Sequence, residues 1–139
     1  MTPYEYQQLA NRTLCDQSNA IDRMCAGRRL SPINCTDGEL IPVTLNHSII
    51  GMCGEVGELA AELQRWIYYG KELNIKNIKE ELGDVLWYIA EACNALGINM
   101  EDLMKWNIEK LKARYPERYT DQLADEENRD KLKELAAIK

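Results

Sequence analysis

Apolar residues recur with helical spacing in two long segments of this chain, residues 44–70 and 74–97. Placed at about 100° per residue, the apolar side chains of each segment fall on one stripe that covers roughly 120° of a helix. The alternation of apolar and polar residues that marks strands does not occur anywhere in the sequence. The pattern therefore predicts two amphipathic helices that each bury one face. The first stripe contains Ile49, Val56, Leu59, Ala60, Leu63, Trp66 and Ile67, and the second contains Leu82, Val85, Leu86, Ile89, Ala92, Cys93 and Leu96.

Residues that begin and end helices extend this pattern to four main helices. Thr2 followed by Pro3 is a typical N-terminal signal, and Gly70 and Gly97 are typical C-terminal signals. The predicted helices run from Pro3 to about Ala20 or Met24, from Thr44 or Asn46 to about Gly70, from Asn74 to Gly97, and from Asn99 to Pro116.

The remaining segments lack this periodicity. Residues 26–43 contain two glycines and two prolines, which predicts a long loop. Residues 120–139 are acidic at their start and rich in lysine at their end, as expected for one solvated final helix. We therefore expect a single all-α domain over residues 1–139. It would be a bundle of four main helices with its core at about 44–119, plus a C-terminal helical tail.

The charge of the chain narrows the classes of partner. The 139 residues include 17 Lys and Arg against 23 Asp and Glu, a net charge of -6. This balance disfavours binding to a nucleic acid polymer or to an anionic membrane surface, each of which needs a basic stripe. A small phosphorylated ligand stays compatible with it, because a bound cation can invert the local field.

Cysteine usage and the lack of long apolar runs suggest a soluble cytoplasmic protein. None of the five cysteines has C-x-x-C spacing and His47 is the single histidine, so a structural zinc site is not expected. The scattered cysteines fit reduced thiols that serve as packing residues. The polar N-terminus shows no signal peptide, and the apolar run VLWYIA is too short to span a bilayer.

Acidic residues line one margin of both apolar stripes. Glu55, Glu58 and Glu62 lie on one edge of the first stripe, and Glu81 and Asp84 lie on the matching edge of the second. Antiparallel packing of the two stripes would bring Glu55, Glu58, Glu81 and Asp84 toward one crevice. Ionised carboxylates at such a place repel one another, unless some are protonated or a hard divalent cation binds them. Mg²⁺ prefers oxygen ligands of this kind, whereas the alternative is a solvated helix face without metal.

The acidic motif and a second motif resemble a known family. The pattern E55-x-x-E58, 22 intervening residues and E81-x-x-D84 is followed by ELGDVLWY at 81–88 and NIEKLKARYP at 107–116. Together they resemble the MazG-type all-α nucleotide pyrophosphohydrolases over roughly residues 44–119. The resemblance implies hydrolysis of a nucleoside triphosphate between its α and β phosphates, which releases the monophosphate and pyrophosphate.

The resemblance also implies roles for individual residues. Glu55, Glu58, Glu81 and Asp84 would bind Mg²⁺, with Mn²⁺ able to substitute. Asn107, Lys110, Arg114 and Tyr115 would contact phosphates or sugar. We assign the general base to Glu55 and the neutralisation of the departing pyrophosphate to Lys110.

The second motif can also be explained without a substrate. Asn107, Lys110 and Arg114 follow i, i+3, i+7 spacing and so share one helix face. That face could aim donors at a polyphosphate, or its two cations could pair with Glu109, Glu117 or the tail.

Other residues could contribute to substrate binding or to packing. His47 lies about two turns before Glu55 and could reach a base or a phosphate, although a capping or packing role is favoured. Trp66, Trp87 and Trp106 could stack a base; for Trp66 we favour core packing, and for Trp87 an oligomer interface. We interpret Gly51, Gly54, Gly57 and Gly83 as permitting close helix approach beside the site.

Two alternatives to a general nucleotide hydrolase remain at this point. One is a pyrimidine-restricted enzyme similar to a dUTPase or dCTPase. The other is a non-catalytic helical module for metal binding or oligomerisation. In either case we expect a homo-oligomer, a dimer or tetramer, because a pair of helices leaves apolar flanks uncovered.

Overall fold

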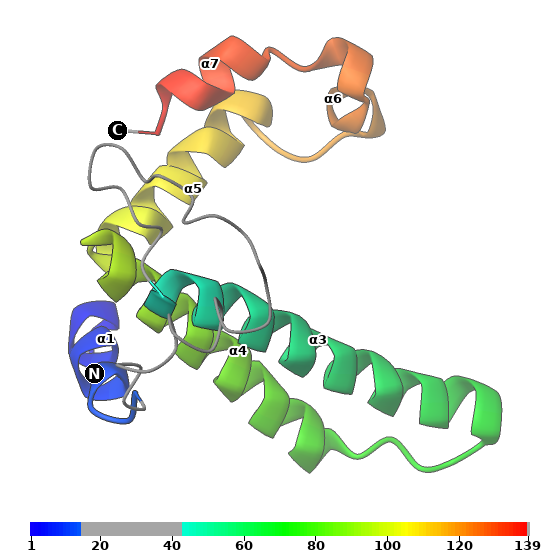
Figure 1. Cartoon of the computed structure of the whole chain (residues 1–139). Coiled ribbons are helices and arrows are strands. Elements are labelled where there is room, and N and C mark those ends of the chain that lie inside the picture. Colours follow the sequence, from blue (N-terminus) through cyan, green and yellow to red (C-terminus); the bar gives the residue numbers. More distant parts are fainter. Residues whose placement is uncertain (15–42, 139) are drawn as a thin grey trace, which may run out of the picture. The chain divides into compact units, whose positions relative to one another are not determined.

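The computed structural model describes residues 1–14 and 43–138, and within these ranges it contains helices and no strand (Figure 1). The predicted all-α class is therefore confirmed. The elements are α1 (Pro3–Asn11), α3 (Val43–Tyr69), α4 (Ile75–Leu96), α5 (Met100–Arg114), α6 (Asp121–Ala124), the short 3-10 helix η1 (Glu126–Asn128) and α7 (Lys131–Ala136). No helix among the described residues is long and apolar enough to cross a bilayer.

Local capping explains the helix ends that the sequence predicts correctly. The Thr2 hydroxyl accepts a hydrogen bond from the Glu5 N–H at 3.1 Å, and the Glu5 carboxylate accepts one from the Thr2 N–H at 2.7 Å. The side chain of Asn74 accepts from the N–H of Asn77 at 3.1 Å to begin α4. Gly97 ends α4 with a positive φ of 65°, a conformation that glycine adopts without strain.

Two predicted boundaries on either side of residues 15–42 need correction. Helix α1 ends at Asn11 and does not reach Ala20, because the N–H and hydroxyl of Thr13 both donate to the Ala10 carbonyl and close the last turn. Helix α3 begins at Val43, so Thr44 lies inside the helix. The predicted extension to Met24 and the predicted loop up to residue 42 lie outside the described residues.

The tail is divided where one continuous helix was predicted. Thr120 caps α6 by accepting from the Leu123 N–H at 3.2 Å, and Asp130 caps α7 by accepting from the Lys133 N–H at 3.0 Å. Each cap begins a new helix, and Arg129 between them has an extended backbone. The predicted helical tail is therefore confirmed, but as separate short helices in place of one, since two side chains with strong capping preference interrupt it.

The described chain forms two compact units, one within residues 1–97 and one within residues 98–139. In the first unit α3 and α4 lie side by side and antiparallel, and α1 packs against α4 (Figure 1). The Trp87 indole N–H donates to the Thr13 hydroxyl at 2.7 Å, and the Asn94 amide donates to the Gln7 carbonyl at 3.3 Å. In the second unit α7 packs against α5. The expectation of one domain over the whole chain stays a prediction.

The apolar stripes are largely uncovered among the described residues, which agrees with the expectation that a pair of helices leaves apolar flanks exposed. Val56 and Trp66 are 51% and 49% exposed on α3, and Leu82 is 53% exposed on α4. A helix pair buries only the line along which the two helices touch, so most of a wide stripe needs a further surface. The buried apolar side chains in the described residues are Ala10, Ala90, Cys93 and Met100.

Polar and charged side chains occupy much of the buried interior instead. Ser48 and Glu91 are fully buried in the first unit, and Gln7, Glu62 and Glu81 are nearly so. The prediction that cysteines are packing residues is correct for Cys93, whereas Cys53 is exposed.

Candidate metal centre

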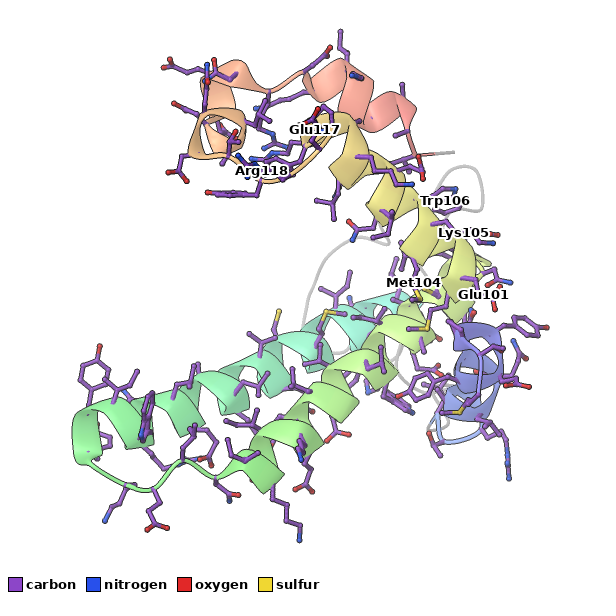
Figure 2. The ribbon with its side chains drawn as sticks, turned by 180° about the vertical axis from the view of Figure 1, so that it is seen from behind. Glu101, Met104, Lys105, Trp106, Glu117 and Arg118 are labelled. Atoms are coloured by element: carbon purple, nitrogen blue, oxygen red, sulfur yellow. The ribbon has the colours of Figure 1, made fainter. Side chains whose placement is uncertain are left out.

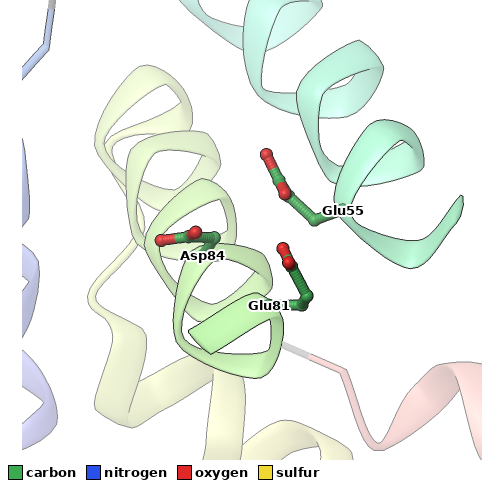
Figure 3. A group of neighbouring side chains, drawn as sticks. All are labelled: Glu55, Glu81 and Asp84. Atoms are coloured by element: carbon green, nitrogen blue, oxygen red, sulfur yellow. The ribbon is translucent and has the colours of Figure 1, made fainter. Parts of the chain in front are cut away.

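Three carboxylates from two helices meet beside the line of contact between α3 and α4. Glu55 comes from α3, and Glu81 and Asp84 come from successive turns of α4 (Figure 3). One oxygen from each lies within 4.8 Å of the oxygens of the other two. The i, i+3 spacing on α4 and the antiparallel pairing with α3 create this cluster, as the sequence predicts for these three residues.

The surroundings of the cluster favour a bound cation or a proton. Partial burial raises the pKa of Glu55 above its ordinary value, and a hydrogen bond with Glu81 and the negative charge of Asp84 raise it further. Glu81 is 6% exposed, and the Asn77 amide donates to its Oε1 at 2.9 Å. This hydrogen bond holds the Glu81 carboxylate in position, and the oxygens of Glu55 and Asp84 lie across a shared space from it. Three oxygen donors with such mutual repulsion fit a hard divalent cation such as Mg²⁺.

Glu58, the fourth predicted ligand, lies outside the group. Its side chain is exposed one turn beyond Glu55, and its oxygens are not among those within 4.8 Å of one another. Its charge still contributes to the raised pKa of Glu55. The structure therefore brings three of the four predicted acids together, and the role of Glu58 as a ligand stays a prediction.

Glu62, further along the same margin, has a different partner. It is 7% exposed and forms an ion pair with Arg65, one turn later on α3. A cation at i+3 thus neutralises this acid without a metal, and the Glu62–Arg65 spacing in the sequence is the signal that could have predicted it.

The residues of the second motif lie on α5, in the second unit. Asn107 is exposed and Lys110 is half-buried. Arg114 donates from Nη2 to the Ala124 carbonyl at 2.8 Å, and its guanidinium lies 5.0 Å from the centre of the Tyr115 ring. These contacts fit the alternative in which the tail engages Arg114, and the substrate roles of these residues stay predictions.

Other charged residues of α5 pair locally. Glu109 forms an ion pair with Lys112 at 2.7 Å, so it is not the partner of Lys110 or Arg114. Figure 2 shows Met104, Lys105 and Trp106 along α5, and Glu117 and Arg118 in the turn that follows it. Lys105 pairs with Asp102 at 3.3 Å.

His47 lies in an aromatic group of the first unit. Its ring centre is 6.4 Å from that of Trp87 and 5.6 Å from that of Tyr88. Its buried Nδ1 has no hydrogen-bond partner among the described residues. These contacts fit the packing role that the sequence analysis favoured, and contact with substrate stays a prediction.

Sequence reasoning missed two groups near the acids. Glu91 is fully buried, and burial raises its pKa although a hydrogen bond from Asn94 and the charge of His47 oppose the shift. It lies two turns after Asp84 on the same margin of α4, which is a signal the sequence contained. Tyr6 on α1 has a pKa raised by burial and by the charge of Asp84. Periodicity does not predict this electrostatic interaction, because it depends on how α1 docks.

The glycines beside the site differ from one another. A Cβ at Gly51 would overlap the ring of Tyr88, so this glycine does permit a close approach. A Cβ at Gly54, Gly57 or Gly83 would meet no described atom within 4 Å. The prediction of close approach is therefore confirmed at Gly51 alone.

Comparison with known proteins gives two findings. Residues 44–119 match the family model described as the MazG nucleotide pyrophosphohydrolase domain. The chain is also similar to the Gene 37 protein of Mycobacterium phage L5, with 32% identity over 75 residues. That alignment covers 50% of this chain and 65% of the phage protein, which is less than two thirds of its length. No solved structure matches.

Proposed function

This chain belongs to the MazG nucleotide pyrophosphohydrolase family, and from that membership we propose that it hydrolyses nucleoside triphosphates between the α and β phosphates. The products would be the nucleoside monophosphate and pyrophosphate. The observation that carries the proposal is the cluster of Glu55, Glu81 and Asp84, whose oxygens converge across two helices. A solvated helix face would not need a buried, hydrogen-bonded acid such as Glu81 within such a group.

Mg²⁺ would be held by Glu55, Glu81 and Asp84, with Glu58 from the next turn of α3. When bound, the cation lowers the pKa of a coordinated water and neutralises phosphate charge. Mn²⁺ would substitute, because it takes the same oxygen ligands, whereas Zn²⁺ favours nitrogen and sulfur ligands that this site lacks.

Glu55 would accept the proton of the attacking water. Its place between the two helices puts its carboxylate within the acidic cluster that would hold the cation. The ammonium of Lys110 would neutralise charge on the departing pyrophosphate, and the Asn107 amide would orient the phosphate or the sugar. Arg114, Tyr115 and His47 complete the proposed set of substrate contacts.

The active form would be a homo-oligomer, a dimer or tetramer. The exposed side chains of α3 line an open groove of about 400 Å³ whose residues include Ala60, Leu63 and Ile67. A second copy is the occupant we propose, because its own exposed stripe presents the same apolar chemistry. Light scattering at micromolar concentration should show at least a dimer, and a monomer at that concentration would contradict this part of the proposal.

The reaction is tested with a panel of common ribonucleoside and deoxyribonucleoside triphosphates in ¹⁸O-labelled water. We expect pyrophosphate as the primary product, with the label in the nucleoside monophosphate and a requirement for Mg²⁺ or Mn²⁺. Label in pyrophosphate would indicate attack at the β phosphorus, and free orthophosphate would indicate a γ-phosphatase. Either result would overturn the proposal. Products from pyrimidine nucleotides alone would point to the restricted enzyme.

A matched pair of variants tests the acid cluster. Glu81→Gln should lower the rate by orders of magnitude, because it removes one buried oxygen ligand. Glu80→Gln changes the adjacent exposed residue outside the cluster and should retain activity. Equal activity in the two variants would refute the assignment of the site, and metal binding without hydrolysis in the wild type would favour the non-catalytic module.

A further inference from the structure

A cavity of about 220 Å³ lies between the C-terminal end of α5 and the tail. All of its lining residues belong to the second unit, residues 98–139. Three of them are cations, Arg114, Arg129 and Lys133. The volume is below the roughly 300–1,000 Å³ typical of pockets that hold drug-sized ligands. It suits a small ion with its waters rather than a whole nucleotide.

The two acids that line the cavity already have partners. Both oxygens of Glu134 accept from the guanidinium of Arg129, at 3.0 and 2.7 Å. This pairing lowers the pKa of Glu134, and the positive charges of Arg114 and Lys110 lower it further. The side chain of Asp130 accepts from the Lys133 N–H as the cap of α7. Glu134 and Asp130 therefore bring two negative charges to the cavity, against the three positive charges of Arg114, Arg129 and Lys133.

Donor capacity remains on two cations at this cavity. The Nε of Arg114 is buried and has no hydrogen-bond partner among the described residues, although Nη2 donates to Ala124. The ammonium of Lys133 makes no ion pair within 4 Å in the described part of the chain, whereas Lys131 on the same helix pairs with Glu126 at 3.6 Å. A buried guanidinium nitrogen without an acceptor is costly, so a ligand that supplies an oxygen would be stabilising.

We propose that this cavity binds a small phosphate-class oxyanion, with Arg114 and Lys133 as its donors. Guanidinium and ammonium groups are the side chains that form charge-assisted hydrogen bonds with phosphate oxygens. The inference goes beyond hydrolysis and shares one residue with it: Arg114 is also a proposed substrate contact, so the nucleotide arm of the inference rests on the proposed function. Lys133 belongs to neither the acid cluster nor the proposed substrate contacts. The oxyanion could be free orthophosphate or the phosphate group of a nucleotide, and both have the same donor requirements.

The test uses the full chain with a chelator present, so that the acid cluster holds no metal. Orthophosphate and a nucleoside monophosphate are titrated separately, and binding is followed by calorimetry and by amide shifts of residues 113–134. We expect saturable binding of at least one probe, and the tighter probe identifies the source of the oxyanion. Lys133→Gln should weaken it about tenfold, as expected for the loss of one charge-assisted hydrogen bond. Lys131→Gln, an exposed charge on the same helix, should leave the affinity unchanged.

A second variant keeps the test decisive. Arg114→Lys retains the charge but removes the Nε donor, and it should weaken binding while the helical circular dichroism stays that of the wild type. If Arg114→Lys unfolds the tail, the comparison of Lys133→Gln with Lys131→Gln decides by itself whether the cavity binds the oxyanion. The proposal is overturned by the absence of saturable binding for both probes, or by equal affinity in the two lysine variants. Failure of the proposed hydrolysis is seen separately, because that reaction requires metal.

Discussion

Replacing Gly51 with alanine tests the contact between α3 and α4 next to the acid cluster. A Cβ at this position would lie 2.6 Å from the hydroxyl oxygen of Tyr88 and closer still to its ring. The ring would have to move, although it packs against Trp87 with a centre-to-centre distance of 4.9 Å and against His47. Gly51→Ala should therefore strain this aromatic group.

Two opposing terms set the size of the effect. Alanine in place of a helical glycine stabilises by about 1 kcal/mol through helix propensity. Overpacking by one methyl group costs about 1–3 kcal/mol. The net change is a destabilisation of roughly 0–2 kcal/mol. Gly54→Ala provides the matched control, because a Cβ there meets no described atom within 4 Å and only the favourable term applies.

The difference between the two variants isolates the packing term. Urea unfolding followed by circular dichroism, at one fixed protein concentration, should show Gly54→Ala more stable than Gly51→Ala by about 1–3 kcal/mol. The concentration is fixed because oligomer formation would shift the apparent stability. If Gly51→Ala proves as stable as Gly54→Ala, the close approach of Tyr88 to α3 does not exist as described.

Two further predictions concern acidic residues of α4, the buried Glu91 and the exposed Asp84. Burial raises the pKa of Glu91 above its ordinary value of 4.5, so its contribution to stability is fully present below pH 4.5 and is lost as the pH rises through the raised pKa. Glu91→Gln should accordingly gain stability relative to the wild type between pH 5 and pH 8 in urea unfolding, and a constant difference would contradict the assignment. Asp84→Asn should weaken Mg²⁺ binding measured by calorimetry. With a chelator present, it should also raise the unfolding free energy by easing the repulsion on Glu55. A metal-free variant less stable than the metal-free wild type would refute that repulsion.

Helix ends were predictable where the signal is local. Asn74 and Gly97 bracket α4 because a side-chain cap and a positive φ depend on one or two residues. The same rule could have divided the tail, since Thr120 and Asp130 are both strong capping residues. The change from acidic to lysine-rich residues along the tail suggested one helix there, and this charge pattern was a weaker signal than the capping residues.

The acid cluster was predictable in part. Glu81 and Asp84 share a face by spacing alone, and antiparallel packing brings Glu55 to them. Glu58 has the same i, i+3 relation to Glu55, yet its exposed side chain lies outside the group, which spacing alone does not predict. Periodicity placed Trp66 on the apolar face and favoured core packing for it, yet its side chain is 49% exposed, because periodicity does not specify which surface covers that face.

The stretch that matches the family is shorter than the part of the chain held together by hydrogen bonds. The match covers residues 44–119, whereas Trp87 donates to Thr13, Asn94 donates to Gln7 and Arg114 donates to Ala124, all across its limits. A chain trimmed to the matched residues would lose three acceptors, at about 1 kcal/mol each. Engineers who transplant this domain, or who cut it for expression, should therefore keep the flanking helices, because boundaries drawn by similarity pass through bonded contacts.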